Sequence, residues 1–173
     1  MLDTLGNLGD FIGGIGVIVT VIYLAFQIRQ STASTKSASY QAVVSAVSDW
    51  SRTVGSDRDL ARIVRIGTQD PSQLEVDEYT QYEMLIISVS RNFENVHYQH
   101  QCGGIPKAAW NGWSFRILSF YAAPGVQTLW QKHKRSYSVE FMEFIENGCK
   151  QYADDAVTFG HEAPPNKTVE SDA

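Results

Sequence analysis

Residues 5–30 read LGNLGDFIGGIGVIVTVIYLAFQIRQ and combine a long apolar run with many glycines. Within this stretch, residues 11–28 carry no charged side chain. Folded as an α-helix, that run is about 27 Å long, close to the roughly 30 Å hydrocarbon thickness of a bilayer. The run therefore predicts a helix that can span a membrane.

The residues that flank the apolar run distinguish a retained anchor from a removable signal peptide. A signal peptide begins with a positively charged region and has a shorter apolar core. Here Asp3 and Asp10 precede the run, without any Lys or Arg, so we expect the helix to be retained. Arg29 and Lys36 follow it. By the positive-inside rule, the N-terminus lies outside and the C-terminal domain in the cytoplasm.

Small residues recur along this helix at spacings of three and four, which places them on one face. They are Gly6, Gly9, Gly13, Gly16 and Thr20, called here the small-residue stripe. Such a face lets two membrane helices approach closely, so we interpret it as a packing surface. The alternative is that glycine is simply common in membrane helices. A phosphate-binding loop is excluded because neither GxGxxG nor GxxxxGK[ST] occurs.

The rest of the chain predicts a helical bundle. No Gly or Pro occurs between Val17 and Val54, so the membrane helix can continue into the first helix of the bundle, with a weak point at the Ser/Thr-rich residues 31–39. Amphipathic spacing predicts further helices over 57–67, from the acidic residues just before Tyr79 to Gln101, and over 108–122, 126–136 and 139–147, with Asp57 and Ser138 as N-caps. Since no alternation of period two occurs, we predict an all-α fold.

The predicted organisation has three parts. Residues 1–30 form a membrane anchor, residues 31–152 a helical bundle, and residues 153–173 an extended or flexible tail, which contains Pro164, Pro165 and mostly polar residues. The net charge of −5 argues against nucleic acid as a partner, because duplex binding needs a basic surface.

The sequence shows little catalytic potential. Cys102 and Cys149 are too few for a disulfide framework or a zinc cluster, and we expect two reduced thiols. A bridge between them is the alternative if the domain faces an oxidising compartment. No serine lies in a GxSxG motif. We therefore predict no catalytic residue, no cofactor and no enzymatic activity.

One segment has the spacing of a metal site. Glu94 and His97 form a Glu-x-x-His pair on one helical face, and His100 lies one turn further on. Ferritin-like di-iron bundles need two such pairs and two further glutamates, and the sequence contains no second pair. Histidines of the core or of an interface are therefore favoured over metal ligands, and a metal-binding or redox bundle is the alternative function.

Two groups of basic residues are candidate contact surfaces. Arg58, Arg62 and Arg65 share one side of a short helix, which is either a solvated face or a contact with anionic lipid or a partner. A second group lies beside aromatic residues and comprises Lys132, His133, Lys134 and Arg135. Cations at a helix C-terminus also fit the helix dipole, so a solvated helix end is equally consistent with this group.

Several segments together resemble a family of uncharacterised bacterial proteins, a domain of unknown function. These are GVIVTVIYLAFQIRQST (residues 16–32), RNFENVHYQHQCGG (91–104), the two tryptophans Trp110 and Trp113, and PGVQTLWQKHKRSYSVEFMEFI (124–145). The resemblance runs from about Leu8 to Asn147. It implies one N-terminal membrane helix and a helical cytoplasmic domain, and it identifies no catalytic residue.

The leading hypothesis is therefore a bitopic protein of the inner (cell) membrane. It would act as a scaffold or accessory subunit, through self-association or through docking on a larger membrane complex. Membrane lipid and either a second copy or another membrane subunit are the expected partners.

Overall fold

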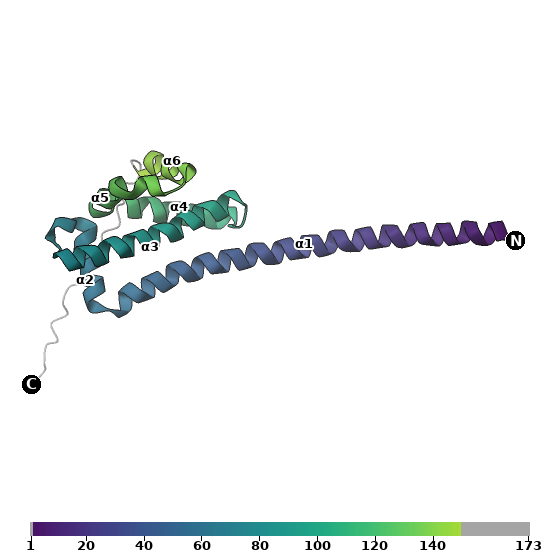
Figure 1. Cartoon of the computed structure of the whole chain (residues 1–173), viewed down its shortest axis with the longest axis horizontal. Helices are drawn as coiled ribbons and strands as arrows, with labels where there is room; N and C mark the ends of the chain where they lie inside the picture. Colours follow the sequence, from purple (N-terminus) through teal and green to yellow (C-terminus); the bar gives the residue numbers. More distant parts are fainter. Residues whose placement is uncertain (1, 150–173) are drawn as a thin grey trace, which may run out of the picture.

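Helix α1 (Leu2–Ser56) is one continuous helix of 55 residues, about 80 Å long at 1.5 Å per residue. In the computed structural model, the backbone is described for residues 2–149 and the side-chain surroundings for residues 13–149. Figure 1 shows the N-terminal part of α1 extending far beyond the other helices. Residues 2–149 contain six α-helices and no strand, so the all-α prediction is confirmed. The predicted tail, residues 153–173, lies outside the described residues.

The Ser/Thr-rich segment does not interrupt α1. The Thr32 hydroxyl donates a hydrogen bond to the Ile28 carbonyl at 2.9 Å, and the Thr35 hydroxyl donates to the Ser31 carbonyl at 3.0 Å. These bonds reach back one turn and leave the helical hydrogen bonds in place. The expected weak point is thus helical, and the apolar segment is continuous with the first helix of the bundle.

The two halves of α1 differ in their surroundings. Every side chain from residue 13 to residue 38 is exposed. From Ser39 onward the helix packs against the bundle, and Val43 and Trp50 are only 2% and 9% exposed. The N-terminal half is long and apolar enough to cross a membrane, and no residue of its apolar window is buried.

Helix α3 (Val76–Gln101) runs antiparallel to the second half of α1. The indole nitrogen of Trp50 donates to the Leu85 carbonyl at 3.0 Å, and the Asn92 amide donates to the Ala46 carbonyl at 3.4 Å. Further along, Gln99 of α3 lies opposite residues 31–39 of α1. The C-terminal end of α3 therefore lies nearest to the apolar part of α1.

Helix α2 (Arg58–Gln69) and the short 3-10 helix η1 (Pro71–Gln73) connect α1 to α3. The predicted N-cap of α2 is confirmed. One Asp57 carboxylate oxygen accepts hydrogen bonds from the backbone N–H groups of Asp59 and Leu60, at 2.8 and 3.0 Å. These two hydrogen bonds satisfy backbone N–H groups that the first turn of a helix leaves unpaired.

Three helices follow on the other side of α3: α4 (Lys107–Tyr121), α5 (Pro124–His133) and α6 (Val139–Gly148), with the 3-10 helix η2 (Lys134–Ser136) between the last two. Helix α5 begins two residues earlier than predicted, because proline suits the first helical position, where its missing N–H is not needed.

Ser138 occupies the N-cap position of α6, but the predicted capping by its side chain was wrong. No side-chain capping bond forms. Instead, the Ser138 backbone N–H donates to the Glu94 carboxylate of α3 at 2.7 Å. A tertiary contact replaces the local cap.

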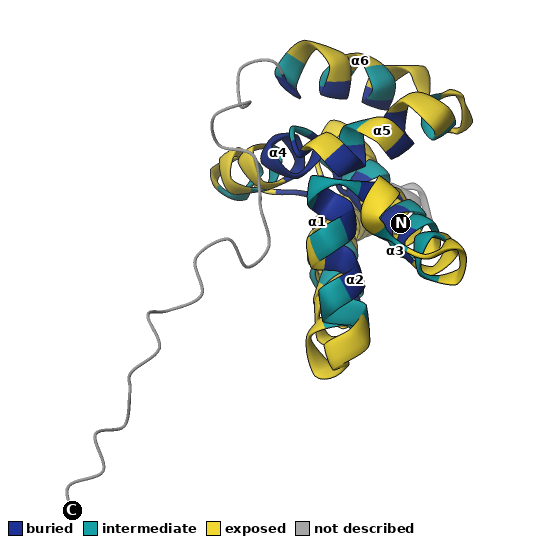
Figure 2. Cartoon of the chain, turned by 90° about the vertical axis from the view of Figure 1, so that its left-hand side faces the viewer, coloured by how far each residue is buried: buried dark blue, intermediate teal, exposed yellow. Residues whose placement is uncertain are grey.

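The bundle encloses an aromatic core. Figure 2 shows that the buried faces of the helices point toward one another, while their outer faces are exposed. Phe120 is the centre of this core: its ring lies 5.3 Å from that of Phe93, 6.5 Å from Trp50 and 5.7 Å from Tyr121. These edge-on contacts join α1, α3 and α4, and such pairs stabilise a core beyond their area burial.

Helices α2 and α5 approach each other at two glycines. A Cβ atom placed on Gly125 would lie 1.8 Å from the Gly67 carbonyl oxygen, and one on Gly67 would lie 2.6 Å from the Tyr82 ring. The sequence predicted that α2 ends near Gly67, but the helix continues to Gln69. Gly67 permits close packing rather than terminating the helix.

We predict that Gly125→Ala lowers the free energy of unfolding by about 1–3 kcal/mol or more, because the added methyl group forces α2 and α5 apart. Gly112→Ala is the matched control, since Gly112 lies within α4 with no atom near its would-be Cβ. That control is expected to be neutral or stabilising by about 0.5–1 kcal/mol. Denaturant unfolding followed by circular dichroism measures both, and equal effects would contradict the proposed crossing.

Candidate functional site

The small-residue stripe is uncovered in the part that the structure describes. No atom lies within 4 Å of a would-be Cβ on Gly13 or Gly16. The Thr20 hydroxyl donates to the Gly16 carbonyl at 2.8 Å and so stays close to the helix. Gly6 and Gly9 are part of α1, but their surroundings lie outside the described residues. The stripe from Gly13 to Thr20 is flat and open to another helix.

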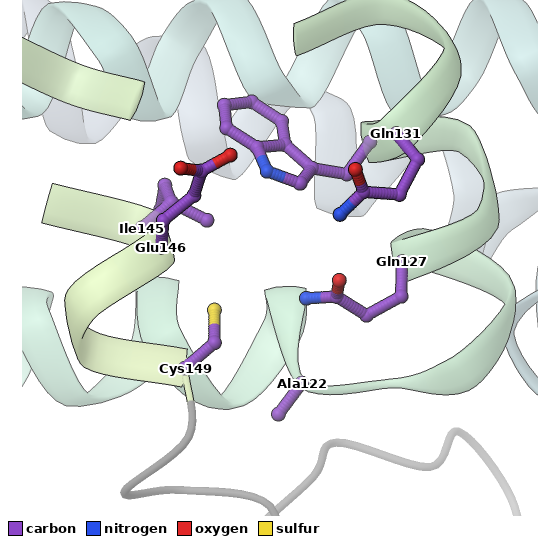
Figure 3. Close-up of a pocket in the computed structure, with 7 residues that line it drawn as sticks. Ala122, Gln127, Gln131, Ile145, Glu146 and Cys149 are labelled. Atoms are coloured by element: carbon purple, nitrogen blue, oxygen red, sulfur yellow. The ribbon is translucent and has the colours of Figure 1, made fainter. Parts of the chain in front are cut away.

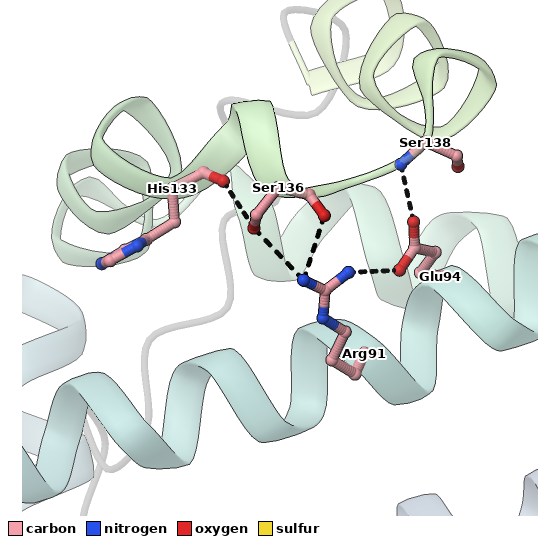
Figure 4. A network of polar contacts seen from close by, with 5 residues as sticks. All are labelled: Arg91, Glu94, His133, Ser136 and Ser138. Atoms are coloured by element: carbon pink, nitrogen blue, oxygen red, sulfur yellow. Dashed lines mark hydrogen bonds and ion pairs between the residues drawn. The ribbon is translucent and has the colours of Figure 1, made fainter.

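Glu94 links α3 to the segment between η2 and α6 (Figure 4). Its carboxylate accepts hydrogen bonds from the Arg91 guanidinium at 2.8 Å and from the Ser138 N–H at 2.7 Å. The other arm of Arg91 donates to the Ser136 carbonyl at 3.0 Å. Burial opposes ionisation of Glu94, but these hydrogen bonds hold the pKa of its carboxyl below the ordinary value. Both carboxylate oxygens are thus used in a structural contact.

His97 and His100 lie among aromatic rings. The His97 ring stacks on Phe144 at 4.8 Å and is 5.7 Å from Phe141. The His100 ring is parallel to Trp110 at 3.8 Å. Burial, and next the nearby His100, lower the pKa of His97.

These positions bear on the alternative function, a metal-binding or redox bundle. Within residues 13–149, no group of three or more His, Cys, Asp or Glu side chains could hold a metal ion. The Glu94 carboxylate is engaged by Arg91 and Ser138, and the two imidazoles pack in the aromatic cluster. The described residues give the metal hypothesis no structural support.

The two thiols differ in exposure, and both are free. Cys102 is exposed at the C-cap of α3. Cys149 is buried at the end of α6, and burial raises its pKa to about 11. A thiol with this pKa stays protonated at neutral pH and is a weak nucleophile.

Cys149 lines a cavity of about 420 Å³ between α5 and α6 (Figure 3). Two of its other polar side chains, Gln127 and Glu146, have partners in the bundle, whereas the buried Trp130 indole nitrogen has none among the described residues. The Gln127 amide donates to the Tyr121 carbonyl, and the Glu146 carboxylate pairs with Lys134 at 2.6 Å. The cavity presents no activated nucleophile and no base aimed at the sulfur.

Most of the second basic group is paired within the bundle. Lys132 and His133 both contact the Glu83 carboxylate at 2.6 Å, and Lys134 pairs with Glu146. Arg135 is exposed. These contacts connect α5 and η2 to α3 and α6, so this group contributes to the structure of the bundle, with Arg135 at its surface.

The first basic group lines the second cavity, a groove of about 590 Å³ formed by α1, α2 and α4. We call it the arginine groove. Its apolar lining includes Trp50, Val54, Ala61 and Val64, and its cationic lining comprises Arg58, Arg62, Arg65 and Arg116. The volume is typical of a ligand site, and such sites combine apolar walls with a few charged groups.

The arginines of the groove are held in different ways. Arg62 is ion-paired with Glu78 of α3. The hydrogen bond to Glu78, and next the Glu78 charge, raise the pKa of Arg62. The same hydrogen bond, and next the Glu75 backbone N–H, lower the pKa of Glu78. Arg58 and Arg65 are exposed and make no ion pair among the residues that the structure describes. The groove therefore keeps positive charge for an external group.

The groove lies at the end of the bundle that is remote from the apolar part of α1. Along a straight helix, Ser56 is about 42 Å from Ile28. If the apolar segment spans a membrane along its normal, the groove lies well beyond the lipid headgroups. Of the two contacts considered for Arg58, Arg62 and Arg65, this position favours a partner over the membrane surface.

Sequence reasoning missed two members of the groove. Arg116 is isolated in the sequence and joins the group only because α4 packs beside α1 and α2. Trp50 lies on α1, where it lines the groove and its indole nitrogen donates to the Leu85 carbonyl of α3. Neither position carries a local signal of a binding site.

Comparisons of the chain with protein-family models, curated proteins and solved structures found no match.

We predict that protonation of His97 destabilises the bundle. Its pKa is lowered in the folded state, whereas an imidazole in the unfolded chain has a pKa near 6.5. The unfolded state therefore binds more protons below about pH 6.5, so the stability that neutral His97 provides is complete above that pH and declines below it. His97→Phe keeps an aromatic ring without the titration. Its melting temperature should fall less than that of the wild type between pH 7.5 and 5.5, and parallel curves would contradict this role.

Proposed function

We propose that this protein is a non-enzymatic, bitopic protein of the inner (cell) membrane, in which α1 anchors a helical domain that acts as a scaffold or accessory subunit. The observation that carries the proposal is the uncovered apolar half of α1. Its large side chains are about half to two-thirds exposed, from 47% for Ile15 to 66% for Phe26. Soluble proteins rarely expose apolar surface of this extent, and contact with lipid removes it from water.

The charges around the apolar segment support an orientation. Arg29 follows the segment directly, and Lys36 lies two turns further on, still on an exposed part of α1. Since positive charge is retained on the cytoplasmic side, the bundle lies in the cytoplasm and the N-terminus outside.

The proposed association rests on the stripe. Gly13 and Gly16 leave an open strip along an exposed helix, and close backbone approach in lipid gains dispersion contacts. The partner is a second copy of this chain or a helix of a larger membrane complex. The earlier resemblance to bacterial proteins with one membrane helix is consistent with this architecture and remains a prediction.

The orientation predicts how Cys102 reacts in spheroplasts of cells that produce the protein. Cys102 is exposed and Cys149 is buried, so a membrane-impermeant maleimide reports Cys102. We expect labelling only after the membrane is permeabilised, and none in a Cys102→Ser control. Labelling of intact spheroplasts would place the bundle outside and contradict the proposed orientation.

Replacing stripe residues should weaken association of the anchor. Gly13→Leu and Gly16→Leu each place a large side chain on the proposed contact face, so both should reduce the oligomeric or complexed fraction. Gly14→Leu is the matched control, because Gly14 lies off the stripe and is equally open. Chemical crosslinking and native mass measurement of the solubilised protein report the change. Equal effects of all three variants, or no effect, would remove the packing role.

A further inference from the structure

A cavity of about 320 Å³ lies between α1 and the turn that ends α3. We call it the polar notch. Helix α1 supplies Lys36 and four hydroxyl side chains between Ser31 and Ser39, and the end of α3 supplies Gln99. Lys36 is the one cation among the described residues that line the notch, and none of them is acidic. The notch is therefore a polar site with a net positive charge.

A glycine turn shapes the wall of the notch opposite α1. Gly103 has a left-handed φ of 69°, and the N–H groups of Gly103 and Gly104 donate to the carbonyls of His100 and Gln99 at 3.0 and 2.7 Å. This is the pattern of hydrogen bonds with which a glycine ends a helix. A Cβ atom on Gly103 would lie 3.5 Å from the Lys36 ammonium nitrogen. Glycine thus permits the turn and leaves the ammonium group uncovered on that side.

Several hydrogen-bond donors of the notch are unused. Its two threonine hydroxyls donate to carbonyls of α1. Within residues 13–149, by contrast, the hydroxyls of Ser31 and Ser39 and the amide of Gln99 donate to no other residue, and Lys36 forms no ion pair. A cation beside several free donors suits an anion with many acceptor oxygens, such as a phosphate.

The position of the notch along α1 indicates where such a phosphate comes from. With α1 along the membrane normal, Ser31 lies about 5 Å and Lys36 about 12 Å beyond Ile28. The headgroup layer is about 5–8 Å thick on each side of the bilayer. Helix side chains tilt toward the N-terminus, here toward the membrane, and a lysine extends its ammonium group to the interface. Arg29 precedes Lys36 by seven residues, nearly two full turns, and so lies on the same side of the helix.

We propose that the polar notch binds the phosphate of an anionic phospholipid headgroup. The Lys36 ammonium pairs with the phosphate, and the donors of Ser31, Ser39 and Gln99 bond its oxygens. The acyl chains lie along the apolar half of α1. A lipid held in this way ties the end of α3, as well as α1, to the membrane surface. The inference rests on the proposed membrane anchor, but not on which side of the membrane the bundle faces.

Lipid titration of the full chain in a mild detergent tests the proposal, with native mass spectrometry as the measure of bound lipid. The probes are short-chain phosphatidylglycerol, which is anionic, short-chain phosphatidylcholine, which carries the same phosphate but is zwitterionic, and inorganic phosphate. We expect phosphatidylglycerol to bind most tightly. Lys36→Gln should weaken its binding about fivefold, the effect of one cation at an anionic lipid surface, and Lys36→Arg should retain it.

Lys107→Gln is the matched control, because Lys107 is an exposed lysine shortly after the turn that does not line the notch. It should bind phosphatidylglycerol as the wild type does. Equal affinity of the wild type and Lys36→Gln, or an equal loss in Lys107→Gln, would overturn the proposal. Inorganic phosphate that binds as tightly as phosphatidylglycerol would also overturn it and assign the notch to a soluble phosphate.

Flotation with vesicles of phosphatidylglycerol and phosphatidylcholine separates this inference from the proposed function. Wild type and Lys36→Gln should both float, because the anchor is intact in each. A chain that floats but shows no lipid preference dependent on Lys36 contradicts the notch alone. A wild-type chain that does not float contradicts the anchor and the notch together.

Discussion

The structure depends on one constraint: a single unbroken helix, α1, has two different environments along its length. Up to residue 38 every described side chain is exposed, and most are apolar in the first part. From Ser39 the same helix supplies Val43 and Trp50 to the core of the bundle. Because a helix is rigid along its axis, the orientation of the apolar half of α1 fixes the orientation of the bundle. An anchor and a domain that share one helix cannot reorient freely as they could on a flexible linker.

The positions of the remaining helices depend on the packing of α3 against α1. Trp50 is central to this arrangement, because its indole nitrogen bonds the Leu85 carbonyl while its ring contacts Phe120 of α4. The same residue forms part of the arginine groove. The groove is therefore built on a rigid part of the bundle, at the end remote from the apolar segment. The two candidate contact surfaces, the stripe in the anchor and the groove in the bundle, lie at opposite ends of the molecule and can engage different partners.

Most of the fold could be predicted from the sequence, because helix periodicity and the Asp57 cap are local signals. The errors were also physical. The predicted helices ended at Gly67 and began after Gly125, whereas both glycines lie inside helices and permit a close crossing. The Glu94-x-x-His97 spacing left a metal site as the less favoured alternative; in the structure Glu94 pairs with Arg91 one turn away on α3, and tertiary packing brings the Ser138 N–H to it. Proximity between distant segments, such as Arg116 of α4 and the arginines of α2 in one groove, leaves no trace in local sequence patterns.

The central claim is that the apolar half of α1 lies in lipid while the rest of the same helix lies in water. Spin labels on single cysteines at Ile18, Phe26, Thr35 and Ser45, in a Cys102→Ser background, test it most directly after reconstitution into vesicles. Collision rates with oxygen, which concentrates in lipid, and with a water-soluble nickel complex report the surroundings of each position. The account predicts oxygen-accessible, nickel-shielded labels at 18 and 26 and the reverse at 35 and 45. Nickel accessibility at all four positions would contradict it.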